Sequence, residues 1–290
     1  MPQSRINFEA LEADFESRQE RAFSRADLLS IFRSAPLDWN LPRNIEEQVF
    51  IEMLLRRTKM REIKLVSSDY PLVVRYVWGK TVASVSVALS IKRHAFLSHS
   101  SAMWIHGIGG DENRIYINVE QSKKPRTHSA LTQESIDRAF RNKQRRSRLV
   151  YKYNNATITV LSGKNSGNLE VGPSKTPSGE QVEATSLERT LIDITVRAAY
   201  AGGVAQVLEG FRRSRGRVSV EKVLWVLKGL DYIYPYHQAI GFYIKQAGYG
   251  EADQDLVRKL GTPFLFYLSH ESKHLALDED FKVFFPKPLK

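Results

Sequence analysis

Apolar residues at helical spacing open the chain. Phe8, Leu11 and Phe15 recur every three or four residues, which predicts an amphipathic helix over 7–20. The next stretch, FSRADLLSIFRSAP, predicts a second helix. This helix should end before Pro36, because proline disfavours helical geometry in the residue that precedes it.

The start of the second helix carries a capping signal. Ser24 is the expected N-cap, and Asp27 follows it at the distance of a capping box. Phe23 and Leu28 flank this box at the positions of a hydrophobic staple. The sequence therefore fixes where this helix begins.

A third helix is predicted after the polar connection LDWNLPR. Asn44 is its expected N-cap and Glu47 the partner of that cap. The expected buried stripe consists of Val49, Phe50, Met53 and Leu54.

The pattern changes to alternation after the third helix. MREIKLVS and LVVRYVW surround the turn residues SSDYP, which predicts a two-stranded hairpin. Three helices followed by a hairpin is the order of a winged helix-turn-helix, which we expect over residues 1–80. In that fold the third helix enters the major groove of DNA and the hairpin touches the backbone.

Polar and basic side chains follow the expected DNA-contacting elements. The candidate DNA-binding residues are Arg43, Gln48, Arg56, Arg57, Lys59, Arg61 and Lys64. Two features oppose this interpretation: the connection to the third helix is longer than a usual turn, and Glu46, Glu47 and Glu52 lie on or beside that helix. The alternative is a small helical domain with a solvated basic edge.

Residues 81–290 mix helical and strand patterns, so we expect a larger α+β domain there. VASVSVALSI predicts a short helix, RIYINV a buried strand, and LTQESIDRAF a helix capped at Thr132. Strands are expected on both sides of Asn154-Asn155, and KNSGNLEVGPSKTPSGEQ is expected to be a mobile loop. Further helices are expected after a capping box of Thr185 and Glu188, around 204–213 and 219–229, and over YPYHQAIGFYIKQAG.

Composition adds a partner class to this architecture. Hydrophobic residues make up 42% of the chain and aromatic residues 10%, which is enough for a globular core. Cysteine is absent, and no apolar run reaches about 18 residues, so we expect a cytoplasmic protein without membrane association. The net charge of +11 favours a polyanionic partner, with nucleic acid first among the candidates.

The stretch HAFLSHSSAMWIHGI holds most of the candidate chemistry. Ser98 and Gly107 would cap a helix in which His99 and His106 are seven residues apart. That spacing separates the side chains by about 10 Å along the axis, which is too far for one metal ion. No G-x-S-x-G, Walker A or G-x-G-x-x-G sequence is present, so no catalytic site, metal or cofactor is expected.

Three other segments have both a structural and a functional interpretation. Arg189, Asp193 and Arg197 follow at four-residue steps, typical of a surface ion-pair ladder. Residues 121–152 hold ten basic residues, which would extend a nucleic-acid footprint, meet an acidic partner or form a solvated surface. The tyrosines of YIYPYHQ are expected to pack between helices rather than stack on bases.

A combination of these segments resembles the AbiEi family of type IV antitoxins and transcriptional regulators. The segments are RYVWG, FLSHSSAMWIHGI, SLERTLIDI, GGVAQVLEGFRR and IGFYIKQAGY, in the family's order over residues 24–250. Ser98, His99, Ala102, His106 and Gly107 match its Ser-His…Ala…His-Gly pattern. Glu188, Arg189, Thr190, Leu191 and Asp193 match its ERTL-x-D segment.

The resemblance implies a function with two parts. The N-terminal winged helix would bind the promoter of the protein's own operon, and the C-terminal domain would counter an AbiEii-type nucleotidyltransferase toxin without a stable complex. The expected antitoxin surface consists of His99, His106, Lys123, Lys124, Arg138, Arg141, Arg145, Arg146, Arg189 and Asp193. The alternatives are a DNA-binding regulator or interaction protein without a toxin partner and, less favoured, a nuclease acting through Glu120 and Lys123.

Overall fold

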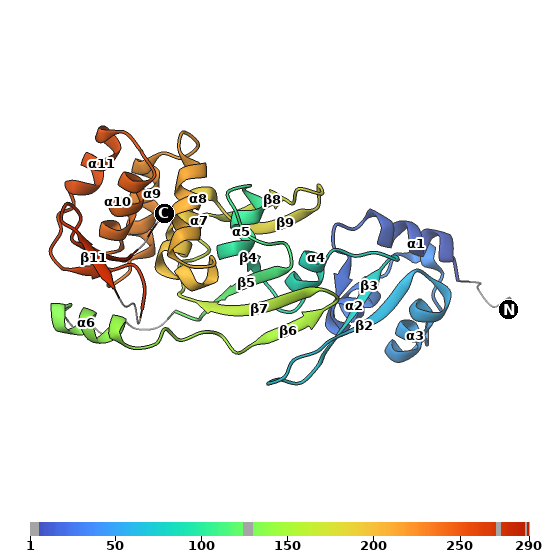
Figure 1. The fold of residues 1–290 in the computed structure, drawn as a ribbon. Helices are drawn as coiled ribbons and strands as arrows, with labels where there is room; N and C mark the ends of the chain where they lie inside the picture. The colour runs from blue at the N-terminus through green and yellow to red at the C-terminus, as the bar shows by residue number, and fades with distance from the viewer. Residues whose placement is uncertain (1–5, 124–129, 271–273, 288, 290) are drawn as a thin grey trace. The chain divides into compact units, whose positions relative to one another are not determined.

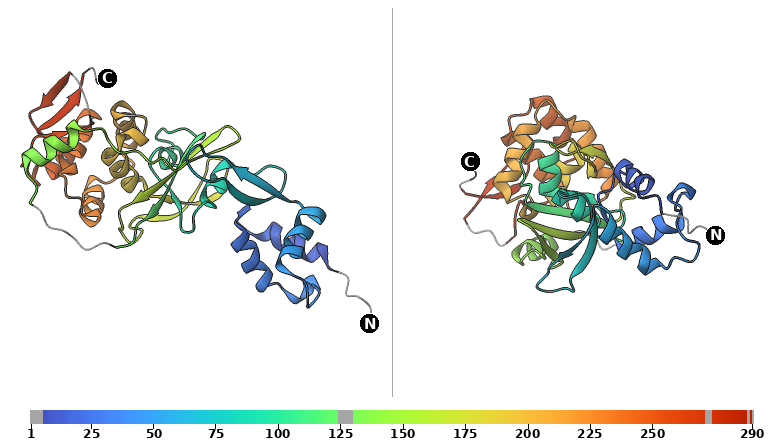
Figure 2. Two further views of the ribbon diagram at one scale, coloured as in Figure 1. Left: turned by 90° about the horizontal axis from the view of Figure 1, so that it is seen from below. Right: turned by 90° about the vertical axis from the view of Figure 1, so that its right-hand side faces the viewer.

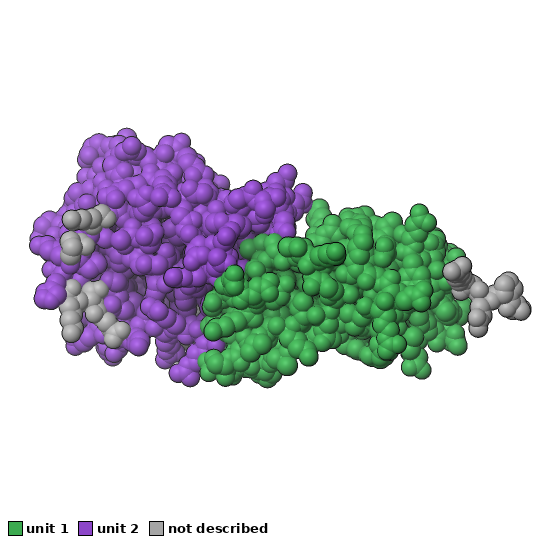
Figure 3. All heavy atoms as spheres, turned by 45° about the vertical axis from the view of Figure 1, so that its right-hand side comes forward, with its two compact units in different colours: residues 1–95, 149–158 green, residues 96–148, 159–290 purple. Residues whose placement is uncertain are grey.

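The computed structural model describes residues 6–123, 130–270, 274–287 and 289. The chain divides into two compact units, which are coloured separately in Figure 3. Unit 1 consists of residues 1–95 and 149–158, and unit 2 of residues 96–148 and 159–290. Unit 1 thus contains the whole of the expected 1–80 domain together with two further segments.

Unit 1 is built from short helices and a three-stranded sheet (Figure 1). Its elements are α1 (Phe8–Ser17), β1 (Ala22–Phe23), α2 (Arg25–Arg33), the 3-10 helix η1 (Leu37–Trp39), α3 (Glu47–Arg57), β2 (Met60–Leu65), β3 (Val73–Trp78), α4 (Ser84–Leu89) and β6 (Val150–Tyr153). The sheet has the order β1-β3-β2, and both pairs are antiparallel. Aromatic rings fill the core, with Phe15 stacked on Trp39 and Trp78.

The first two helices form where local sequence signals predict them. The side-chain oxygen of Ser24 accepts a hydrogen bond from the Asp27 backbone N–H, and the Asp27 carboxylate accepts one from the Ser24 N–H. Leu11 and Phe15 bury the inner face of α1. Helix α2 ends at Arg33, before Pro36 as predicted.

Helix α3 begins later than predicted. Its N-cap is Glu46, whose side chain makes no capping hydrogen bond, so the prediction of Asn44 as the cap is wrong. Phe50 and Ile51 are buried, whereas Val49 is 49% exposed. Successive helical residues differ in direction by about 100°, so a face centred between residues 50 and 51 turns residue 49 outward.

Unit 2 contains the larger part of a six-stranded mixed sheet. The strands are β4 (Phe96–Leu97), β5 (Arg114–Glu120), β7 (Ala156–Gly163), β8 (Val171–Lys175) and β9 (Gln181–Thr185), in the order β6-β7-β5-β4-β9-β8. The division between the units falls inside β7. β4 pairs antiparallel with β5 and parallel with β9. The combination of helices and separate sheets agrees with the α+β class predicted for the chain.

The helices of unit 2 gather around one apolar core (Figures 1 and 2). They are α5 (His99–Ile105), α6 (Gln133–Arg141), α7 (Leu187–Val196), the 3-10 helix η2 (Ala198–Tyr200), α8 (Val204–Ser214), α9 (Val220–Leu230), α10 (Tyr236–Gln246) and α11 (Glu251–Arg258). A small sheet of β10 (Phe266–Tyr267), β12 (Val283–Pro286) and β11 (Leu275–Asp278) packs beside them.

Helix α6 packs against the C-terminal strands, which are distant from it in sequence (Figure 2). The Gln133 amide donates to the Leu265 carbonyl at 3.0 Å. The Tyr267 hydroxyl donates to the Asp137 carboxylate at 3.0 Å. Thr132 caps this helix as predicted, with Ser135 as its capping partner.

Two predictions for unit 2 need correction, and two short elements were not predicted. The segment predicted as a mobile loop contains β8, because VGPSK pairs through its backbone with β9. The N-cap of α7 is Ser186 rather than Thr185, which lies at the end of β9. The short elements β4 and α11 were not anticipated, because two residues show no periodicity and α11 is mostly polar. The hairpin at Asn154-Asn155 is confirmed, as are the helices α8, α9 and α10.

Within the described residues, no helix combines the length and the apolar character needed to cross a bilayer.

Candidate functional site

The residues proposed to contact DNA share one property, which is exposure. All seven are exposed, and they come from the loop before α3, from α3 itself, from the α3–β2 connection and from the two ends of β2: Arg43, Gln48, Arg56, Arg57, Lys59, Arg61 and Lys64. The α3–β2 connection is short, so the last turn of the helix and the first strand residues present their cations on consecutive elements.

Several of these cations already have partners within unit 1. The Lys59 ammonium lies 2.7 Å from the Glu16 carboxylate, and this hydrogen bond raises the pKa of Lys59. The Arg61 guanidinium donates to the Gly79 carbonyl at 2.8 Å and also to the next carbonyl. The Arg57 guanidinium lies 5.4 Å from the centre of the Phe8 ring. These three side chains are therefore held close to the protein surface.

Two other cations are available to an external anion. Arg43 and Arg56 are exposed, and neither has a hydrogen bond or ion pair with the residues that the structure describes. Between them along α3, the Gln48 amide accepts a hydrogen bond from Arg25 and donates one to Glu52. The outward-facing row of α3 therefore carries both signs of charge. Glu52 is hydrogen-bonded to Gln48, and the row ends at Arg56, which has no partner among the described residues.

The turn between β2 and β3 is apolar rather than basic. Val66 is 60% exposed, Leu72 52% and Tyr70 42%. Lys64, at the end of β2, lies 3.9 Å from the Glu62 carboxylate. Positive charge is therefore concentrated at the α3 end of the hairpin, away from its turn.

Of the three histidines of HAFLSHSSAMWIHGI, His94 is exposed, whereas His99 and His106 lie at the two ends of α5 and contact different parts of unit 2. His99 is buried as the first residue of α5 with φ +51°, and its Nδ1 lies 2.9 Å from the Ser98 hydroxyl. Burial lowers the pKa of His99 to about 4. His106 caps the other end of α5, and its Nε2 donates to the Thr185 carbonyl at 2.7 Å. Burial also lowers the pKa of His106.

Metal ligation finds no support around these histidines. Within the described part of the chain, no three His, Asp or Glu side chains are grouped closely enough to hold a metal ion. Ser98 occupies the predicted N-cap position, but its hydroxyl contacts the His99 ring instead of capping the helix. Gly107 adopts φ +66° after the helix, as expected for a C-terminal glycine.

The predicted ion-pair ladder on α7 is buried rather than on the surface. Arg189 and Asp193 are 3% and 4% exposed, and the Arg189 Nε donates to Asp193 Oδ1 at 2.9 Å. The other oxygen, Asp193 Oδ2, is buried without a hydrogen-bond partner. Arg197 is exposed and donates instead to the Arg145 carbonyl. The surface interpretation fails because the 164–170 loop covers this face of α7.

Glu120 holds that covering loop in place. Its carboxylate accepts hydrogen bonds from the Ser166 N–H, the Ser166 hydroxyl and the Asn168 N–H. Although burial opposes the effect, these bonds and the Arg189 charge lower the pKa of Glu120. Arg189 reaches the same loop by donating to the Leu169 carbonyl at 2.9 Å. The residue considered as a nuclease carboxylate is thus engaged in a structural network.

Eight of the ten residues of the expected antitoxin surface are either buried or exposed. His99, Arg189 and Asp193 are buried together near the centre of unit 2, so they could support such a surface only through the residues that they position. Five others are exposed cations: Lys123, Arg138, Arg141, Arg145 and Arg146. His106 is half-buried, and Lys124 lies outside the described residues.

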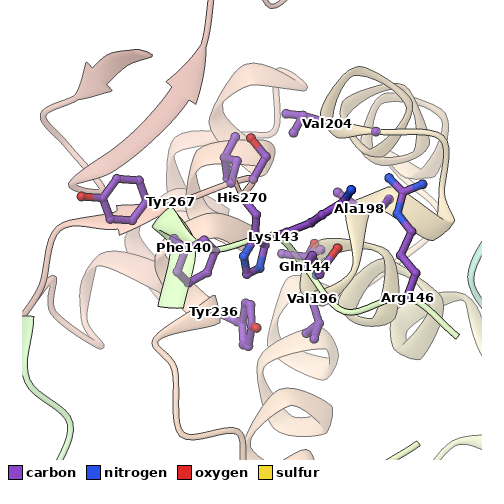
Figure 4. A pocket seen from close by; sticks show the side chains of 15 residues that line it. Phe140, Lys143, Gln144, Arg146, Val196, Ala198, Val204, Tyr236, Tyr267 and His270 are labelled. Carbon is purple, nitrogen blue, oxygen red and sulfur yellow. The ribbon is translucent and has the colours of Figure 1, made fainter. Parts of the chain in front are cut away.

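A pocket in unit 2 was not anticipated from the sequence (Figure 4). Lys143, Gln144 and Arg146 line it from the segment after α6, and Phe140, Tyr236, Tyr267 and His270 supply rings. The tyrosines of YIYPYHQ pack among themselves and on Phe266, as predicted, and Tyr236 also faces this pocket. The only sequence feature that indicates this pocket is the high density of basic residues at 138–148.

Comparison with solved structures finds a protein of similar architecture. The crystal structure of the RV2827C protein from Mycobacterium tuberculosis aligns with 98% of this chain and 94% of its own, with a TM-score of 0.53 and 14% identity. At that identity the likeness concerns the fold. No family model matches the chain, and no curated protein matches its sequence.

Proposed function

We propose that this protein is a cytoplasmic DNA-binding regulator that represses its own promoter through a winged helix in unit 1. The observation that carries the proposal is the element order of unit 1, with α1, β1, α2 and α3 followed by the antiparallel β2–β3 hairpin. All seven candidate contact residues are exposed on this unit. In a winged helix-turn-helix, the third helix places its outward-facing side chains in the major groove of DNA.

The available cations decide which contacts matter most. Arg43 and Arg56 can each neutralise a phosphate without giving up a partner, whereas Lys59 must leave Glu16 and Arg61 must leave two carbonyl groups. Each phosphate contact contributes about 0.9 to the slope of log K against log salt. We therefore expect the first pair to dominate affinity and salt dependence.

The test is a gel-shift titration of the full chain on a duplex from its own upstream region, at several salt concentrations. The double variant Arg43→Ala/Arg56→Ala should weaken binding at least tenfold and reduce the salt slope by about 2. The control, Arg212→Ala/Arg213→Ala, removes exposed cations from unit 2 and should leave affinity within twofold. Equal binding by all three proteins would refute the proposed interface.

Replacing Glu52 tests the same interface with a variant that should strengthen DNA binding rather than weaken it. It lies on the outer row of α3 between Gln48 and Arg56, so its carboxylate would approach the DNA phosphates. Glu52→Gln should therefore strengthen binding two- to fivefold, while Glu183→Gln, an exposed glutamate on β9, should have no effect. Unchanged affinity in the first variant would mean that α3 does not face the DNA.

The second part of the proposal is that unit 2 counters an AbiEii-type nucleotidyltransferase toxin. It rests on the resemblance of FLSHSSAMWIHGI and SLERTLIDI to the AbiEi family, and both segments belong to buried elements of unit 2. Co-expression with a nucleotidyltransferase encoded beside the gene should restore growth. Failure of rescue, or the lack of such a gene, would favour the alternative of a regulator without a toxin.

A further inference from the structure

The pocket of unit 2 combines positive charge with an absence of negative charge. Its cavity volume is about 240 Å³. The walls come from α6 and the segment after it, the end of α7, the start of α8 and the strand end after β10. The lining includes Lys143, Arg146 and His270, and it contains no aspartate or glutamate.

The two cations at the pocket belong to a longer basic run. Six basic residues occur between positions 138 and 148 without an acidic residue among them: Arg138, Arg141, Lys143, Arg145, Arg146 and Arg148. All six are exposed, and in the described residues none has a carboxylate partner. Figure 4 shows Lys143 and Arg146 on the pocket side of this segment. An anion placed there would meet cations that no carboxylate of the described residues pairs with.

Neutral donors face the same space. Tyr236 is 9% exposed and lines the pocket, yet its hydroxyl has no hydrogen-bond partner in the part of the chain that the structure describes. Helix α8 starts at the pocket wall with Gly203 as its N-cap, without a side-chain cap or an acidic residue in its first turn. Backbone N–H groups at such a helix start carry partial positive charge.

The aromatic side chains are less suited to recognise a ligand ring. Phe140 is enclosed between Tyr267 and His270, with ring centres 5.6 Å and 4.6 Å away and nearly parallel planes. Neither face of Phe140 is therefore open for stacking. The His270 ring is itself fixed, because its Nδ1 donates to the Asn142 carbonyl at 3.0 Å. The polar donors, rather than the rings, must provide specificity.

We propose that this pocket binds a phosphate group. A phosphate accepts hydrogen bonds from several directions and carries up to two charges, which suits an ammonium, a guanidinium, a hydroxyl and backbone amides. Two sources share this chemistry: a mononucleotide, and the 5′-phosphate of a nucleic-acid strand lying along the basic run. The site is in unit 2 and does not depend on the proposed DNA interface of unit 1.

The test is calorimetric titration of the full chain at low salt with four probes. These are inorganic phosphate, AMP, and a twelve-nucleotide single strand with or without a 5′-phosphate. Lys143→Gln/Arg146→Gln should weaken binding of phosphate probes at least tenfold. Arg138→Gln/Arg141→Gln, which removes two cations of the same run outside the lining, should weaken it less than threefold. Tyr236→Phe should weaken it two- to fivefold with an unchanged unfolding midpoint.

The probes distinguish the two sources. AMP binding at least as tightly as the phosphorylated strand assigns the pocket to a small phosphorylated effector. Tighter binding of the strand, lost with its 5′-phosphate, assigns it to a strand end. The proposal is overturned if no phosphate probe binds. It is also overturned if the wild-type chain binds the strand equally with and without its 5′-phosphate and the Lys143→Gln/Arg146→Gln variant binds it as tightly as wild type. The circular dichroism spectrum of that variant establishes that it is folded.

Discussion

The buried imidazole of His99 predicts a defined loss of stability in mild acid. Burial lowers its pKa from 6.5 to about 4 in the folded chain. At pH 5 the unfolded chain therefore holds a proton on this residue that the folded chain does not. Unfolding takes up this proton, so acid favours it, and the loss develops as the pH falls from about 6.5 to about 4.

The size of this effect follows from the pKa difference. One pKa unit corresponds to about 1.4 kcal/mol, so a shift of this size is worth about 3 kcal/mol in total. Of this, about 2 kcal/mol should be lost between pH 7.5 and pH 5.0, where most carboxylates remain ionised. For a unit with 150–250 residues, that corresponds to a fall of roughly 4–8 °C in the unfolding midpoint.

The perturbation that isolates the effect is His99→Asn. Asparagine tolerates the left-handed backbone at φ +51° and does not titrate. His94→Asn is a matched control, because His94 also has positive φ, at +57°, but is exposed. Scanning calorimetry at pH 7.5, 6.0 and 5.0 should show a smaller acid shift for His99→Asn than for wild type and for the control. Ile240→Ala, in the core, identifies the transition of unit 2.

The comparison does not depend on the stability of the variant at neutral pH. His99→Asn also loses the edge contact with the Tyr200 ring, so it should be less stable than wild type at pH 7.5. The prediction concerns only how far the unfolding midpoint falls between pH 7.5 and pH 5.0. An equal acid shift in wild type and His99→Asn would refute the assignment of that loss to His99.

Two further perturbations test the packing of unit 2 by urea denaturation. Asp193→Asn removes the ionic partner of buried Arg189 and should lower the free energy of unfolding by about 3–5 kcal/mol, whereas Arg189→Met/Asp193→Leu should cost less. Gly110→Ala should cost more than about 3 kcal/mol, because φ is +89° and the new Cβ would lie 2.2 Å from the Ser100 carbonyl oxygen. Gly107→Ala, with open space around it, should cost only about 1 kcal/mol.

Each of these comparisons has an outcome that contradicts it. If the double replacement of the ion pair costs as much as Asp193→Asn, the uncompensated Arg189 charge is not the cause of the loss. If alanine is tolerated equally at 110 and 107, the close approach of the α5 backbone at Gly110 is not a constraint on the fold.

Local signals in the sequence determined the elements that were predicted correctly. The capping box of Ser24 and Asp27 and the cap at Thr132 each involve residues three apart, so no tertiary information is needed. The start of α3 could not be found in this way, since Glu46 makes no side-chain cap. Packing of Phe50 and Ile51 into the core decides that boundary.

The candidate sites were likewise predictable only where residues close together in the sequence determine the contact. Spacing of four residues correctly predicted the Arg189–Asp193 pair, but identical spacing occurs on exposed helices, so burial could not be foreseen. The exposed cations of α3 and β2 followed from charge alone. The pocket did not, because Lys143 and His270 are more than 120 positions apart, and nothing in the local sequence indicates their proximity.

The assignment of residues 149–158 to unit 1 determines how the gene can be dissected. The backbone groups of Val66 and Lys152 exchange two hydrogen bonds, at 2.8 Å and 3.2 Å, so a segment encoded far downstream completes the edge of β2. A fragment truncated after residue 95 would leave these bonds unmade and Val66 without its neighbour. A fragment made to test the proposed DNA binding of unit 1 should therefore be designed with residues 149–158 joined back through a short linker, rather than by cutting the reading frame at a single codon.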